Sequence, residues 1–526
     1  MVEGKARSAG ITAIAALQAV LFGLWPILLF YTVTLGAYSP EQLVEPLCFV
    51  CVANLALWSL LRLLKIDAAR AAFIVSVLSL ANFFYLPFSE LLTLPAKLFP
   101  VPIPDMAVFC GYTLLLLTVI LVIARGELPI GKKSHSLNFQ PAVIPAAAIA
   151  AFLCCFNLFG IVDSENRSNA FAADLGAKYF PATSRLKIDN DTEKPDVYYI
   201  VIDGFANSHT LKNFLDYDNS EFIDFLKNNN FYVALKSSSN HDRTVFSVTS
   251  SLNMGLVTPL APLADKAHAG SNAPLKLLRQ NRVMKLFKQA GYRIVNVCSG
   301  FCATDHVPQA DLNLRSGWGT GFNMSLIHMS MLGALEPLLH TVENEYASVR
   351  TAPIRRASEI ANLPGPKFVL IHCLLTHPPF IFDENGGARP LSKQLLSAPY
   401  VKEPYVMQLK YTEKNLKKLL EILCRSGDGK SIVILQSDHG SACTDWHDAE
   451  RYTLERMRIL NAYRVPEHMR GALYQTITPV NTFRVVLNDL FSADLSLQED
   501  QSFIGIPPGD WYKFENVTKL LKNSWK

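Results

Sequence analysis

The stretch IVILQSDHG, residues 432–440, decides the fold. It opens with four consecutive apolar residues, which is typical of a strand buried on both faces of a parallel sheet, and it ends in acid/base residues. The stretches VYYIVIDG (197–204) and FVLIHC (368–373) repeat this arrangement, and amphipathic patterns at 220–227 and 403–424 alternate with the apolar runs. The alternation predicts an α/β domain with a mostly parallel central sheet covered by helices on both faces.

Side chains that commonly bind metal ions follow three of the predicted strands. Asp203 follows the run at 197–202, Asp438 and His439 follow the run at 432–435, and His372 and His377 follow the run at 368–371. One Asp before a Gly is more often a turn former, but carboxyl ends of parallel strands share one edge of the sheet, where ligands bind. Carboxylates and imidazoles at one edge predict a divalent metal, with zinc or manganese preferred and magnesium or calcium as alternatives.

A hydroxyl nucleophile is available in the stretch NHDRTVFSV, residues 240–248. Thr244 lies at an apparent loop-to-helix junction, where backbone N–H groups favour anions and a nearby cation would lower the pKa of the hydroxyl. The alternative is that Thr244 only caps a helix that ends near Met254. Arg243 is a candidate catalytic residue beside it, or an ordinary solvated side chain.

The first third of the chain is predicted to span a membrane. Only 18% of the 526 residues are charged and the mean hydropathy is +0.19, whereas soluble domains average about 25% charged residues. A bilayer requires about 20 apolar residues, so residues 1–163 are predicted to form five transmembrane helices. The second uncharged stretch is short, and a buried or re-entrant helix is its alternative. The uncharged stretches are 10–35, 46–61, 71–89, 106–124 and 134–162.

Basic residues between these stretches predict the orientation, because Lys and Arg stay on the cytoplasmic side. With the N-terminus inside, only Lys97 lies outside, and an odd number of spans delivers the rest of the chain to the outer face. We therefore expect a multi-pass plasma (inner) membrane protein whose C-terminal domain is extracytoplasmic, periplasmic or extracellular. The polar stretch 164–194 reads as a linker and 195–526 as the globular domain. The residues expected inside are Lys5, Arg7, Arg62, Lys65, Arg70, Arg125, Lys132 and Lys133.

The ordered set of Ile-Asp-Gly at 202–204, Thr244, Thr-His-Pro-Pro at 376–379 and Ser-Asp-His-Gly at 437–440 resembles the sulfatase-like branch of the alkaline phosphatase superfamily. The combination of five predicted transmembrane helices with this set of motifs is similar to membrane phosphoethanolamine transferases and lipoteichoic acid synthases. The resemblance implies that 195–526 is an extracytoplasmic, sulfatase-like catalytic domain with an alkaline phosphatase-like fold. It also implies one divalent metal, held by Asp203, Thr244, Asp438 and His439.

The activity implied by the resemblance is the transfer of phosphoethanolamine or phosphoglycerol from a membrane phospholipid to a surface glycan or lipid. Thr244 would carry the group covalently, and His377 would bind it or protonate the leaving oxygen. A second metal site is left open, with His372, Asp445 and His447 as candidates. A hydrolase of phosphate or sulfate esters and a non-catalytic envelope scaffold are the alternatives.

Further features of the sequence bear on the function, the partners and the cysteines. The Cys/Ser-x-Pro-x-Arg sequence of hydrolytic sulfatases is absent from the sequence, which argues against ordinary sulfate ester hydrolysis. The net charge of +4 is too small and too scattered to indicate a nucleic-acid partner. In an oxidising compartment Cys298 and Cys302 could form a disulfide. The segments 261–273 and 317–346 carry no chemistry that the sequence assigns.

Overall fold

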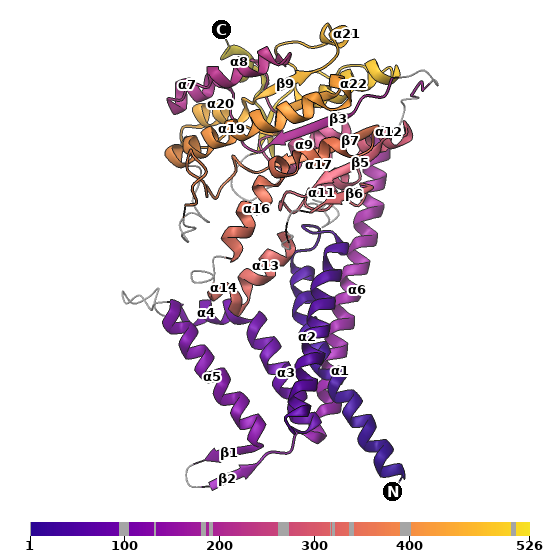
Figure 1. The fold of residues 1–526 in the computed structure, drawn as a ribbon, viewed down its shortest axis with the longest axis vertical. Helices are drawn as coiled ribbons and strands as arrows, with labels where there is room; N and C mark the ends of the chain where they lie inside the picture. Colours follow the sequence, from indigo (N-terminus) through magenta and orange to yellow (C-terminus); the bar gives the residue numbers. More distant parts are fainter. Residues whose placement is uncertain are drawn as a thin grey trace. The chain divides into compact units, whose positions relative to one another are not determined.

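The chain forms two compact units in a computed structural model (Figure 1). The helical unit comprises Met1–Asn166 and Gly319–Val342, and the α/β unit comprises Arg167–Trp318 and Glu343–Lys526. Lys97, Lys132 and most of the segment 261–273 lie outside the described residues. The structure describes residues 2–93, 105–130, 133–179, 186–188, 193–260, 273–315, 317, 321–335, 341–389, 401–505 and 512–525.

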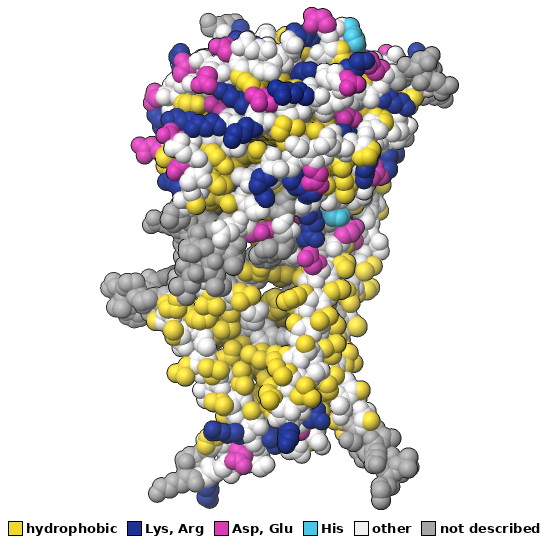
Figure 2. Space-filling model, in the orientation of Figure 1, with side chains coloured by type: hydrophobic (Ala, Val, Ile, Leu, Met, Phe, Trp, Pro, Cys, Tyr) yellow, Lys and Arg dark blue, Asp and Glu magenta, His cyan; other side chains and the backbone are white. Residues whose placement is uncertain are grey.

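The helical unit contains four described helices that are long and apolar enough to cross a membrane. A bent pair, Ala68–Phe83 with Tyr85–Leu91 at 62°, would make a fifth span if it counts as one. The third predicted stretch is therefore the broken one, whereas the short second stretch lies in a helix of sufficient length. Figure 2 shows hydrophobic side chains gathered over this unit. Its helices are α1 (Val2–Val33), η1 (Pro40–Leu43), α2 (Val44–Leu63), α3 (Ala68–Phe83), α4 (Tyr85–Thr93), α5 (Asp105–Arg125), the first part of α6 (Gln140–Tyr179), α13 (Gly321–Met329) and α14 (Met331–Ala334), and its hairpin is β1 (Glu127–Ile130) with β2 (Lys133–Ser136).

The segment Gly319–Val342 belongs to the helical unit although it lies between two strands of the α/β unit in sequence. Phe322 of α13 is fully buried, and its ring lies 5.5 Å from the ring of Phe30 and 5.1 Å from that of Tyr38. The hydroxyl of Tyr38 forms a 2.9 Å hydrogen bond with Ser325. No role was predicted for this segment, and its apolar side chains complete the core of the helical unit.

Helix α6 extends to Tyr179, so the first half of the predicted linker 164–194 is helical. The prediction rested on polar composition and overlooked an apolar stripe at helical spacing, Phe171, Ala172, Leu175 and Tyr179. Ala172 and Leu175 are buried in a cluster within the α/β unit. Burial of this stripe holds the stretch as a helix. Residues 180–185 and 189–192 lie outside the described residues.

The α/β unit is built on a seven-stranded sheet in the order β4-β9-β8-β3-β7-β5-β6. Strands β8, β3, β7, β5 and β6 are parallel, β9 is antiparallel to β8, and β4 is antiparallel to β9. The predicted mostly parallel sheet is confirmed. The strands are β3 (Val197–Ile202), β4 (Tyr232–Val233), β5 (Arg293–Val297), β6 (Leu312–Leu314), β7 (Lys367–Cys373), β8 (Ile432–Ser437) and β9 (Asn461–Arg464).

Helices cover both faces of this sheet, as its continuous apolar strands require. On one face Tyr198, Ile200 and Ile202 pack in a cluster with α7 (Ser208–Leu215), α8 (Ser220–Asn228), α17 (Ala357–Asn362) and α19 (Lys402–Arg425). On the other face Val197, Tyr199 and Val201 pack with α9 (Thr244–Asn253), α11 (Ala273–Arg279), α12 (Arg282–Gln289) and α22 (Pro479–Phe491). The other described elements are η3 (Thr258–Leu260), α16 (Thr341–Arg355), η4 (Gly427–Gly429), α20 (Ala449–Met457), α21 (Glu467–Arg470), β10 (Phe503–Gly505), β11 (Phe514–Asn516) and α23 (Thr518–Asn523).

Candidate functional site

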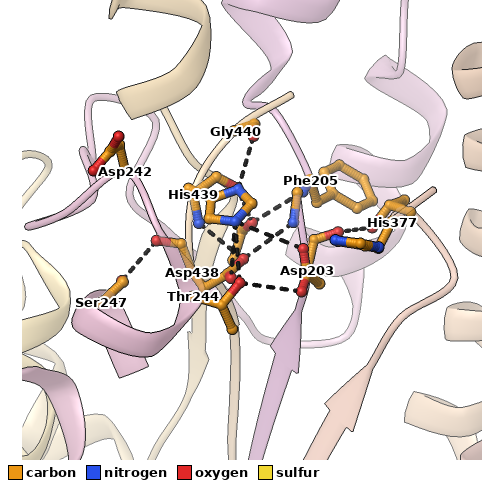
Figure 3. Close-up of polar contacts among 12 residues, drawn as sticks. Asp203, Phe205, Asp242, Thr244, Ser247, His377, Asp438, His439 and Gly440 are labelled. Atoms are coloured by element: carbon orange, nitrogen blue, oxygen red, sulfur yellow. Dashed lines mark hydrogen bonds and ion pairs between the residues drawn. The ribbon is translucent and has the colours of Figure 1, made fainter. Parts of the chain in front are cut away.

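The four residues expected to hold a metal meet at the carboxyl ends of β3 and β8 (Figure 3). These strands are parallel neighbours with Ile202 opposite Ser437, so Asp203 and Asp438 leave the sheet side by side. Thr244 is the first residue of α9. Its Oγ1 lies 3.3 Å from Asp203 Oδ2 and 3.2 Å from His439 Nε2. All four side chains are buried, and Thr244 is the most exposed of them at 7%.

His439 presents an unprotonated ring nitrogen to this cluster. Its Nδ1 lies 3.0 Å from the carbonyl oxygen of Gly440, so Nδ1 carries the proton and donates it there. The lone pair on Nε2 then faces Thr244 and Asp438, whose Oδ2 is 3.2 Å away. Burial, together with the positive charge of Arg456, lowers the pKa of His439 to about 3. The imidazole is therefore neutral and suited to bind a cation.

His372 reaches the same cluster from the end of β7. Its Nε2 lies 3.4 Å from Asp203 Oδ2, and its Nδ1 lies 2.7 Å from the hydroxyl oxygen of Thr304. Ligand atoms of Asp203, His372 and Asp438 all lie within 4.8 Å of one another. The structure thus brings His372, predicted for a second site, into the first one.

Three buried ligand-type atoms in this cluster have no hydrogen-bond partner among the described residues. They are Asp203 Oδ1, Asp438 Oδ2 and His372 Nε2. Buried polar atoms are almost always satisfied, because each unsatisfied one costs about 1–3 kcal/mol. Two oxygens and one nitrogen that point to one place are the donor set of a divalent cation. The residues therefore fit the predicted metal.

The two carboxyl groups titrate in opposite directions. Burial, followed by repulsion from Asp203, raises the pKa of Asp438 to about 6. Burial also acts to raise the pKa of Asp203, but His377 and His372 outweigh it, so that the pKa lies below its usual range. Two buried carboxylates in contact resist carrying two negative charges, and a bound cation would remove that repulsion.

The Thr-His-Pro-Pro loop is tied to the site at both of its ends. The hydroxyl of Thr376 donates a hydrogen bond to the carbonyl oxygen of Asp203. Arg350 of α16 donates to the carbonyl oxygens of residues 377, 378 and 379, at 2.8, 2.9 and 2.6 Å, and its side chain is buried. The imidazole of His377 lies beside Asp203 in Figure 3. Arg350 was not predicted, because nothing in the sequence of α16 reveals its acceptors.

Asp445 and His447 do not join His372, contrary to the second site considered from the sequence. Both lie in an exposed turn before α20, where Asp445 Oδ1 accepts a hydrogen bond from the backbone N–H of His447. The ring of His447 lies 3.7 Å from the ring of Trp446 and is tilted by 35° to it. The turn leads into the helix cap formed by Asp448, so these side chains serve local structure.

The structure also describes Arg243, predicted as a catalytic residue, and the two cysteines that could form a disulfide. Arg243 Nε lies 3.8 Å from Asp242 Oδ2, and its guanidinium lies against Gly505, where an added Cβ would be 2.8 Å from Nη2. Cys298 and Cys302 are free thiols, as are the other eight cysteines of the chain. Cys298 is buried directly after β5, which directs its side chain into the core.

No family model and no curated protein matches the chain. Among solved structures it is similar to the C-terminal periplasmic domain of EcEptC from Escherichia coli, with 14% identity, coverage of 63% of this chain and 95% of that one, and a TM-score of 0.43. It is similar to the integral membrane lipooligosaccharide phosphoethanolamine transferase A from Neisseria meningitidis, with 11% identity, coverage of 93% and 96%, and a TM-score of 0.36. A 2-O GAG sulfatase has 11% identity, coverage of 58% and 72%, and a TM-score of 0.36. Phosphoethanolamine transferases and sulfatases, which the motifs resemble, are thus among the similar structures.

Proposed function

We propose that this protein is a metal-dependent, membrane-anchored transferase. It moves a phospho-alcohol group, phosphoethanolamine or phosphoglycerol, from a membrane phospholipid to a glycan or lipid acceptor at the cell surface. The observation that carries the proposal is the position of Thr244 Oγ1, within 3.3 Å of both a buried carboxylate and a neutral imidazole, beside three unsatisfied ligand atoms. A threonine that only capped its helix would not require such neighbours.

The residues proposed to hold the metal are Asp203 and Asp438, with Thr244 and the imidazoles of His439 and His372 around them. A bound divalent cation supplies positive charge that stabilises the Thr244 alkoxide and the oxygens of the phosphoryl group. The side chains provide the carboxylate and imidazole donors that zinc and manganese accept.

Transfer proceeds in two displacements at phosphorus. In the first, Thr244 Oγ1 gives up its proton to water, which a bound cation would favour, and forms a bond to phosphorus. The bond from phosphorus to the diacylglycerol oxygen breaks, and His377 delivers a proton to that oxygen. In the second, the acceptor hydroxyl gives its proton to His377 and attacks phosphorus, the bond from phosphorus to Thr244 Oγ1 breaks, and Thr244 regains a proton from water. Each displacement inverts phosphorus, so the overall transfer retains its configuration.

Intact mass spectrometry of the full chain tests this proposal. The protein is incubated with mixed membrane phospholipids and Mn²⁺ or Zn²⁺, and Thr244→Ala is compared with wild type. Thr249→Ala is the matched control, because this second threonine of α9 is buried and its hydroxyl donates to the carbonyl oxygens of Val245 and Pro274, away from the cluster. We expect a phosphoethanolamine or phosphoglycerol adduct on wild type and on Thr249→Ala, and none on Thr244→Ala.

Two other results would replace the proposal. Hydrolysis of simple phosphate or sulfate esters by a metal-bound protein that forms no lipid-derived adduct would identify a hydrolase. A protein that binds no metal and forms no adduct would be a scaffold.

A further inference from the structure

We propose that α13 and α14 form an interfacial element of the membrane region, and that their exposed apolar side chains contact the acyl chains of phospholipids in the outer leaflet. The two helices lie in the segment Gly319–Val342, which belongs to the helical unit. The inference goes beyond the proposed function, because it holds whether the protein is a transferase, a hydrolase or a scaffold.

The composition of this segment is that of an element kept away from water. Residues 316–335 contain no Asp, Glu, Lys or Arg, although the sequence carries a charge directly before the run, at Arg315, and directly after it, at Glu336. A charge-free run of this length is typical of a stretch that is either buried in a protein core or in contact with lipid. Which of the two applies depends on how the helices lie.

The two helices are too short to cross a bilayer. Helix α13 has nine residues and α14 has four, so at 1.5 Å per residue α13 reaches about 14 Å, roughly half of the 30 Å hydrocarbon core. The chain turns between them, where the hydroxyl of Ser330 accepts a 3.1 Å hydrogen bond from the backbone N–H of Leu332. A side chain at Gly333 would clash with the carbonyl oxygens of residues 327 and 328. The pair can therefore occupy one interface of the membrane and cannot span it.

One side of the segment is packed against the helices predicted to cross the membrane. Phe322, Met324 and Leu326 are buried. Helix α13 contacts α4, and α14 contacts α3 and α5 (Figure 1). The ring of Phe322 lies against those of Phe30, in the last turn of α1, and Tyr38, and the predicted topology puts this end of α1 outside. The segment thus continues the surface of these helices at their outer ends.

The other side of the segment is apolar and uncovered. Leu332 is 50% exposed, close to the 52% of Leu117 in the predicted span α5. Apolar surface of this kind is unfavourable in water and carries no such cost in contact with acyl chains. Continuity with α3 and α5 identifies the occupant as lipid, because those helices are predicted to meet acyl chains along their length. The apolar side chains that remain partly exposed beside Leu332 are Ile327, Met329, Met331 and Leu335.

The test is site-specific photo-crosslinking of the full-length protein in vesicles of phosphatidylethanolamine and phosphatidylglycerol. The photoreactive amino acid p-benzoylphenylalanine, which reacts with nearby C–H bonds, replaces Leu332, and mass spectrometry identifies what is attached. Leu117 is the positive control, and Leu497 of the α/β unit, which is 48% exposed, is the matched negative control. We expect a phospholipid adduct in comparable yield at positions 332 and 117, bonded through an acyl chain, and none at position 497.

Three results would overturn the inference. The first is the absence of a lipid adduct at position 332 while position 117 reacts. The second is an adduct with the mass of a second copy of the chain, which would make this face a subunit interface. The third is an equal lipid yield at positions 332 and 497. If the variant at position 332 does not fold, the same replacement at Met331 or Leu335 provides the comparison.

The same experiment keeps this inference separate from the proposed function. A lipid adduct at position 332, in a protein that places no phosphoethanolamine or phosphoglycerol on Thr244, would support the interfacial element and remove the transfer function. A group on Thr244 without a lipid adduct at position 332 would support the transfer function and overturn the interfacial element.

Discussion

Replacement of His372 by alanine should weaken metal binding more than replacement of any other histidine outside the Asp438-His439 pair. His372 Nε2 is one of three unsatisfied buried atoms of the cluster, and its Nδ1 is held by Thr304 at 2.7 Å, the arrangement in which a second residue orients a metal-bound imidazole. Loss of such an orienting residue typically costs about 10- to 100-fold in affinity. We therefore expect that range for Thr304→Val and a greater loss for His372→Ala.

The assay is titration of the full-length protein with Mn²⁺, following the EPR signal of the free ion. His447→Ala is the matched control, because that histidine is exposed and its ring contacts that of Trp446. Since alanine also leaves a cavity beside the sheet, His372→Gln should be measured with it. Wild-type manganese affinity in both His372 variants would refute the reasoning and leave the metal to Asp203, Thr244, Asp438 and His439 alone.

The other predictions concern the loop, the pH dependence and the topology. Arg350→Lys should lower kcat by about 10- to 100-fold with a smaller change in KM, because Arg350 positions His377 through three hydrogen bonds to backbone carbonyl oxygens. Arg355→Lys, on the exposed side of α16, should behave as wild type. Equal rates for both variants would contradict this. Glu413 is buried, and burial raises its pKa to about 7 from the usual 4.5. The protonated carboxyl group therefore contributes stability that is fully present below about pH 4.5 and is lost as the pH rises through 7. In wild type the free energy of unfolding should therefore fall by about 3 kcal/mol between pH 4.5 and 8, and Glu413→Gln should abolish this decline. The control Glu421→Gln, at an exposed position, should retain it. An unchanged pH profile in Glu413→Gln would show that burial of Glu413 is not the cause. A reporter fused after Lys526 should be active only outside the cytoplasm, and activity inside would mean that the predicted number of spans is wrong by one.

The sheet and its nearest site residues could be predicted because each is encoded by a short local pattern. The run 197–202 is the observed strand β3 residue for residue, and Thr244 is the observed first residue of α9. Uninterrupted apolar residues have few alternatives to a buried strand, and parallel strands necessarily bring Asp203 and Asp438 to one edge.

What the sequence did not predict depends on contacts between distant segments. His372 was expected at the same edge of the sheet as Asp203, but its contact with Asp203 depends on the register that sets His372 opposite Val201. No local pattern specifies a register between strands about 170 residues apart. Arg350 donates to backbone carbonyl oxygens, which every residue possesses, so the sequence does not reveal which ones will accept. Asp445 and His447 were candidates by composition only, and their turn directs them to solvent.

The insertion of Gly319–Val342 into the helical unit has a consequence for preparing the α/β unit by itself. The chain passes between the two units three times, at residues 166–167, 318–319 and 342–343, so truncation of the N-terminal helices severs only one of the three passages. A fragment that begins at Arg167 would retain α13, and Phe322 and Leu326, which are 0% and 6% exposed in the intact chain, would lose the aromatic partners Phe30, Tyr31 and Tyr38. Such a fragment would expose an apolar helix to water and aggregate through it. Excision of Gly319–Val342 together with the N-terminal helices, with a Gly/Ser bridge across the gap, is the design that follows from the domain boundaries.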